Sequence, residues 1–144
     1  MTQDVFIAQI TAADNGGHEA YETALRRVRE RLRGLEDRAR FDILFPISVK
    51  AQWNAPSATA AQLLRELSPV CPLSCEEAVR ALLSDWDISI EEVPFYIAAR
   101  FGVTRVRQAV GRLASERLTD SEKRNLQAVS YWIDRYEEAY PNGG

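Results

Sequence analysis

Several residue types are scarce in this chain of 144 residues, and each scarcity excludes a class of function. The chain has one histidine, His18, so a Ser-His-Asp or Cys-His catalytic system would have to include that residue. Its two cysteines, Cys71 and Cys75, stand in CPLSC with no histidine nearby, which is too few ligands for zinc. We therefore expect no familiar catalytic residue, no metal and no cofactor.

Long apolar runs and nucleotide-binding motifs are missing as well. No run approaches the roughly 20 apolar residues that cross a bilayer, and residues 1–4 lack the basic start of a signal peptide. The Gly16-Gly17 pair belongs to neither G-x-x-x-x-G-K nor G-x-G-x-x-G, the two phosphate-binding loops. We expect a soluble, cytoplasmic protein that binds no membrane.

Positive charge is not scarce, but it is unevenly placed within a net charge of −3. Residues 26–40 hold seven arginines, residues 76–92 hold six acids, and residues 100–124 hold seven basic side chains. The net charge argues against broad affinity for nucleic acids or anionic membranes. The segregated blocks indicate either solvated helix faces that pair with one another or surfaces that bind a partner.

Most of the sequence has the periodicity of amphipathic helices. Apolar residues recur every three or four positions from Tyr21 to Leu35, which predicts a helix from His18 to about Gly34. Thr104, after Gly102, is the predicted N-cap of another helix. Capping boxes predict four further helix starts, at Thr59…Gln62, Ser74…Glu77, Ser89…Glu92 and Thr119…Glu122.

Two segments leave the choice between strand and helix open. Residues 41–53 alternate apolar and polar side chains as a strand does, but Pro46 would confine them to a sheet edge or to two helical pieces. Residues 5–10 are equally undecided. We predict a mainly α fold, a compact bundle or short helical-hairpin array of about six helices. A small N-terminal β element, giving an α+β fold, is the alternative. We expect one domain over residues 1–144, with 141–144 as a frayed tail.

One motif, IAARFGVTRVRQAVGRLASERLT over residues 97–119, resembles a known DNA-binding element. It is similar to the helix-turn-helix of winged-helix repressors, particularly of the GntR family. The turn matches at Ala98, Phe101, Gly102, Val103 and Thr104, and the second helix at Val106, Arg107, Ala109 and GRL. The resemblance implies a nucleic-acid-binding face made by Thr104, Arg105, Arg107 and Arg112.

The sequence departs from that family in two respects. Its second helix is two residues shorter between Arg105 and Val106, which turns the following residues by about 200°. Residues 119–140 read as a helix where the family has a hairpin wing. The alternative is an ordinary helical hairpin, in which Gly102 ends one helix and Thr104 starts the next.

Acidic and aromatic residues form the other candidate site. Asp85 and Asp87 flank Trp86 near the end of a predicted helix, where negative charge is unfavourable, so they call for a partner such as an arginine of the 100–112 block. Tyr131 and Trp132 lie off the buried stripe of the last helix. Either another element covers them, for example residues 41–53, or they anchor an interface.

These observations favour a non-enzymatic regulatory module that binds another protein. Asp85, Trp86, Asp87, Tyr131 and Trp132 are its predicted protein-binding residues. Small acidic bacterial proteins that neutralise a partner, such as the immunity protein of a toxin, are comparable in kind. DNA is the less favoured partner, and an enzyme of unfamiliar type is the second alternative.

Overall fold

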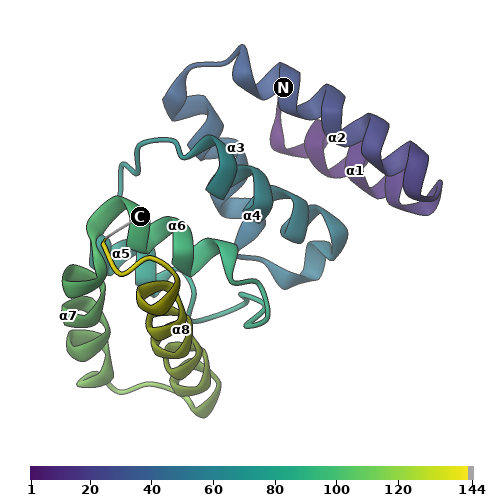
Figure 1. Cartoon of the computed structure of the whole chain (residues 1–144). Coiled ribbons are helices and arrows are strands. Elements are labelled where there is room, and N and C mark those ends of the chain that lie inside the picture. Colours follow the sequence, from purple (N-terminus) through teal and green to yellow (C-terminus); the bar gives the residue numbers. More distant parts are fainter. Residues whose placement is uncertain (143–144) are drawn as a thin grey trace. The chain divides into compact units, whose positions relative to one another are not determined.

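The computed structural model describes residues 1–142, and its secondary structure is entirely helical (Figure 1). The elements are α1 (Gln3–Asn15), α2 (His18–Arg33), α3 (Asp37–Ser48), the 3₁₀ helix η1 (Ala51–Trp53), α4 (Ala55–Leu67), α5 (Cys75–Arg80), α6 (Glu92–Phe101), α7 (Val103–Ala114) and α8 (Asp120–Ala139). The predicted mainly α class is confirmed. The described residues hold eight α-helices rather than about six, because residues 5–10 and 41–48 are helical too. The alternative β element is wrong.

The chain divides into two compact units, residues 1–70 and residues 71–144. The first holds α1 to α4, and the second holds α5 to α8. Whether both units act as the single predicted domain stays a prediction. Of the predicted frayed tail, Pro141 and Asn142 form a turn after α8, and residues 143 and 144 lie outside the described residues.

In the first unit, α1 and α2 form an antiparallel hairpin joined at Gly16 and Gly17 (Figure 1). Gly17 has φ of 93°, a conformation that residues with a Cβ rarely adopt. Helix α1 also packs on α3 and α4, which lie against each other. Helix α2 runs from His18 to Arg33 with Gly34 as its C-cap, which confirms the helix predicted from His18 to about Gly34.

Helix α3 shows why the strand-like alternation of residues 41–49 is misleading. A helix places Phe41, Leu44 and Phe45 on one face, all three are buried, and the two phenylalanine rings stack 4.9 Å apart between centroids. Pro46 lies inside the helix and cannot donate to the carbonyl of Asp42, four residues earlier. The side-chain amide of Gln3 donates to that carbonyl instead, over 2.8 Å, so the proline leaves no acceptor unpaired.

Helix α4 begins at Ala55, four residues before the predicted cap at Thr59. Pro56 fits the first turn, where its missing N–H costs nothing. Thr59 is buried inside the helix, and its hydroxyl is hydrogen-bonded to the hydroxyl of Tyr21 on α2. The Thr59…Gln62 capping box is therefore wrong, because a tertiary contact uses the hydroxyl.

In the second unit, α6 packs against α5, α7 and α8. It buries Tyr96, Ile97 and their neighbours, as expected for a helix that is apolar nearly all round. The boxes that start at Ser74 and Thr119 are confirmed, each with both reciprocal hydrogen bonds. The box at Ser89 and the simple N-cap at Thr104 are not formed: α6 begins at Glu92, and α7 begins at Val103 after Gly102.

Two further absences concern the described residues. None of the helices within residues 1–142 combines the length and the apolar character that a membrane crossing requires. Nowhere in the same range do three His, Cys, Asp or Glu side chains gather as a metal site would need.

Candidate protein-binding surface

The acidic segment lies in a loop, residues 81–91, between α5 and α6. Helix α5 ends at Arg80, so Asp85 and Asp87 do not lie on the helix that the sequence predicted. Both side chains are exposed. The Oδ1 atom of Asp87 accepts hydrogen bonds from the backbone N–H (2.9 Å) and the hydroxyl (2.7 Å) of Ser89. This local pairing explains why Ser89 does not cap α6.

Trp86 differs from the acids that flank it. Its side chain is 3% exposed, and its indole N–H donates to the carbonyl of Ile90 over 3.2 Å. A buried ring with a satisfied polar atom belongs to the core and offers a partner no surface. Trp86, predicted as a binding residue, therefore holds the loop in place from within the core.

Helix α8 is hydrogen-bonded to the backbone of the same loop through two side chains that are seven residues apart. Asn125 is 4% exposed, and its amide donates to the carbonyls of Leu82 (3.0 Å) and Leu83 (3.1 Å). The indole N–H of Trp132 donates to the carbonyl of Ile88 over 2.7 Å. Seven residues are about two helical turns, so both donors lie on one face of α8. The acidic segment and the aromatic pair, which the sequence picked out separately, therefore lie side by side.

The aromatic part of this surface is centred on Tyr131 and Trp132. Tyr131 is 52% exposed, and its ring meets the Trp132 ring edge to face at 4.9 Å between centroids. The Arg135 guanidinium lies 5.2 Å from the centre of the Tyr131 ring. Phe95 of α6 contacts the Trp132 ring edge to face at 6.3 Å. These contacts fix the rings, as the anchors of an interface require.

The carboxylates of Asp85 and Asp87 have no ion pair within residues 1–142, although the sequence suggested an arginine from residues 100–112. The arginine nearest to them in the sequence, Arg80, is paired with another acid. Arg80 forms a bidentate pair with Glu116, at 2.9 and 2.7 Å, which raises the pKa of Arg80 and lowers that of Glu116. The pair Asp85 and Asp87 is left as uncompensated negative charge beside exposed aromatic surface.

The sequence reasoning missed two residues here, one on the surface and one buried beneath it. Ile88 is 39% exposed and lies in the loop of residues 81–91, where no helical or strand periodicity marks it. Asn125 does carry a signal: it is a polar residue adjoining Leu126, one helical turn before Val129, within the buried stripe of α8. A polar residue in an apolar stripe indicates a buried hydrogen bond, here to the loop.

The predicted nucleic-acid-binding residues lie on α7, which is the second helix of a helix-turn-helix formed by α6, Gly102 and α7. Gly102 has φ of 86°, which suits the sharp turn. Thr104 is exposed in the first turn of α7. Helix α8 follows α7, and the residues described contain no hairpin wing.

The arginines of α7 do not share one face. Arg107 pairs with Asp134 (3.0 Å) and Glu137 (3.0 and 3.2 Å) of α8, and these hydrogen bonds, chiefly with Glu137, raise its pKa. Arg105 and Arg112 instead line a polar pocket of about 330 Å³ with Cys75 and Glu76. Arg105 also lies 5.3 Å from the centre of the Phe101 ring. Arg105 and Arg107 are about 200° apart around the helix, so the basic face is divided.

The residues that could support catalysis are dispersed. His18 is exposed at the first position of α2. Cys71 is half-buried and Cys75 buried, and both are free thiols whose pKa is raised, chiefly by burial. A raised thiol pKa lowers the fraction of reactive thiolate, the opposite of what a nucleophile needs.

Comparison with known proteins assigns no family to this arrangement. The chain matches no protein-family model, no curated protein and no solved structure. Its function therefore has to come from its own residues.

Proposed function

We propose that the chain is a non-enzymatic module that binds a basic surface of another protein. Its binding residues are Asp85, Asp87, Ile88, Tyr131 and Trp132, which we call the acidic–aromatic surface. One observation supports this most: the two exposed carboxylates have no ion pair within residues 1–142, while the backbone that carries them is held in place by Trp86, Asn125 and Trp132.

The physical reason is preorganisation. A loop that is already ordered loses little conformational entropy on binding, so more of the contact energy becomes affinity. Tyr131 and Trp132 offer ring surface at low entropic cost, and exposed carboxylates attract a basic partner and select against acidic ones. An inhibitor or immunity-like protein that neutralises a basic partner fits these properties.

A tagged wild-type chain and a charge-reversed Asp85→Lys/Asp87→Lys variant test the proposal. Each is used to capture proteins from the source cell, and the specific partner is then purified and titrated against both chains. We expect a partner with a basic surface and at least about tenfold weaker binding to the variant. A Tyr131→Ala variant should weaken the same complex, because it removes a half-exposed ring without changing charge.

The matched control is Asp14→Lys/Glu22→Lys, which makes the same charge change on exposed residues of the first unit. It should bind the partner as the wild type does. A partner held equally by wild type and by Asp85→Lys/Asp87→Lys would contradict the proposal, as would the absence of any partner specific to the wild type.

DNA binding is the competing function, and the α6–Gly102–α7 hairpin is the observation that supports it. The two ion pairs of Arg107 with α8 count against it, because the charge of that arginine is already neutralised. A DNA-binding chain would lose affinity steeply with salt and in an Arg105→Ala/Arg107→Ala variant.

A further inference from the structure

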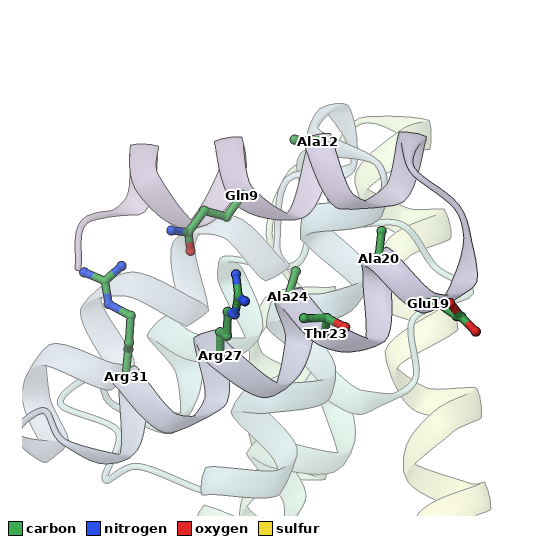
Figure 2. A pocket seen from close by; sticks show the side chains of 8 residues that line it. All are labelled: Gln9, Ala12, Glu19, Ala20, Thr23, Ala24, Arg27 and Arg31. Atoms are coloured by element: carbon green, nitrogen blue, oxygen red, sulfur yellow. The ribbon is translucent and has the colours of Figure 1, made fainter.

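A groove in the first unit, apart from the acidic–aromatic surface, has a different chemistry. It lies between α1 and α2 and has a volume of about 610 Å³ (Figure 2). Its floor is made of small side chains, Ala12 from α1 and Ala20 and Ala24 from α2. Small residues let a third element approach the two helices closely, as ridges fit grooves between packed helices.

One end of the groove is positively charged. Arg27 and Arg31 reach from α2 toward α1, next to the uncharged Gln9 (Figure 2). Both arginines are exposed, and neither has an ion pair within residues 1–142. Two like charges four residues apart on a helix repel each other, so this pair costs stability that a ligand could recover.

Two of the other three arginines of α2 form ion pairs, whereas Arg26 has none within residues 1–142. Arg29 pairs with Glu66 over 2.7 Å, and Arg33 pairs with Glu30 over 3.3 Å. At the opposite end of the groove stands Glu19, eight residues before Arg27 and so about 12 Å away along the helix. The groove is therefore apolar in the middle, positive at one end and negative at the other.

We propose that this groove binds an acidic amphipathic helix of a partner protein. The acidic residues of that helix lie over Arg27 and Arg31, and its small or apolar residues lie on the alanine floor. From Glu19 to Arg31 the groove runs about 18 Å, which is the length of three helical turns. Helix-in-groove recognition commonly uses such an apolar stripe flanked by charge. An extended polyanion matches the groove less well, because only two arginines and an apolar floor line it.

The test is a selection from a phage library of 18-residue helix-forming peptides on the full wild-type chain. Binders to an Arg27→Glu/Arg31→Glu variant are removed by counter-selection. We expect enriched peptides that carry acids at one end and an apolar stripe. Synthetic copies should bind the variant at least about tenfold more weakly than the wild type, and this difference should shrink in high salt.

Two further variants and one further set of peptides make the result specific. An Arg117→Glu/Arg124→Glu variant, with the same charge change outside the groove, should bind like the wild type. An Arg27→Gln/Arg31→Gln variant, which avoids new repulsion on α2, should also lose affinity, and circular dichroism of each chain checks that it is folded. Peptides with lysine in place of their acids should recover binding to Arg27→Glu/Arg31→Glu.

The proposal is overturned if no enriched peptide depends on the two arginines, or if the dependent peptides are not acidic. It is equally overturned if single-stranded DNA or phosphatidylglycerol vesicles bind through these arginines and no peptide does. The Asp85→Lys/Asp87→Lys variant should bind the selected peptides normally, so this proposal and that of the acidic–aromatic surface can fail independently.

Discussion

Replacing Asn125 by alanine should destabilise the second unit and loosen its acidic loop. The change removes two hydrogen bonds, to the carbonyls of Leu82 and Leu83. A typical buried hydrogen bond contributes about 1 kcal/mol net, so the loss is about 2 kcal/mol. It rises toward about 4 kcal/mol if the two carbonyls stay shielded from water, because an unpaired buried acceptor costs more than the bond alone.

Urea unfolding followed by fluorescence measures this loss. Small proteins lose about 1–3 kcal/mol of unfolding free energy per molar urea, and at a slope of about 2 kcal/mol per molar the midpoint should fall by about 1–2 M. Trp86 and Trp132 report on the second unit and Trp53 on the first. Hydrogen exchange of the backbone N–H groups of residues 81–91 should accelerate, because the loop loses one of its two attachments to α8.

The matched control is Gln127→Ala, an exposed position two residues further along α8. It should change the midpoint little, because alanine is at least as good a helix former as glutamine. A loss below about 0.5 kcal/mol for Asn125→Ala, or unchanged exchange in the loop, would refute the view that this amide holds the loop.

Two further predictions concern glycine positions and a thiol. Gly102→Ala should lower the free energy of unfolding by about 1–3 kcal/mol, because φ is 86° at that position. Gly111→Ala should raise it by about 0.5–1 kcal/mol, because Gly111 is an exposed helical residue with open space for a Cβ. Thermal unfolding of the two variants measures both changes. Equal effects would contradict the backbone argument. Burial raises the pKa of Cys71, so its alkylation by iodoacetamide should require a higher pH in the folded chain than in urea. Identical pH profiles in the two states would count against it.

The sequence predicted what depends on local chemistry. The boxes at Ser74 and Thr119 formed because each side chain faces only its own helix end. Thr59 and Ser89 carry the same pattern, but Tyr21 bonds the first hydroxyl and Asp87 the second. Tyr21 lies 38 positions from Thr59 and Asp87 only two from Ser89, but neither residue belongs to the four-residue motif, so the motif alone does not decide these cases.

The candidate surface was predictable to a similar degree. Helical phase placed Tyr131 off the buried stripe of α8, and the ring is indeed half-exposed. Trp86 was predicted to bind a partner together with its acidic neighbours, but the helix ends at Arg80 and the Trp86 ring is buried. That Trp132 touches the acidic loop depends on how α6 and α8 pack, which no periodicity reveals.

The attachment of the acidic loop to α8 also governs when that loop can take its shape during synthesis. The two contacts that hold it join residues 43 and 44 positions apart, Leu82 to Asn125 and Ile88 to Trp132. Contacts of such long range form late, and only after α8 has left the ribosome can they form at all. Until then the loop can form only its local hydrogen bonds, Trp86 to Ile90 and Ser89 to Asp87, so a newly made chain completes its acidic loop only once α8 has folded against it.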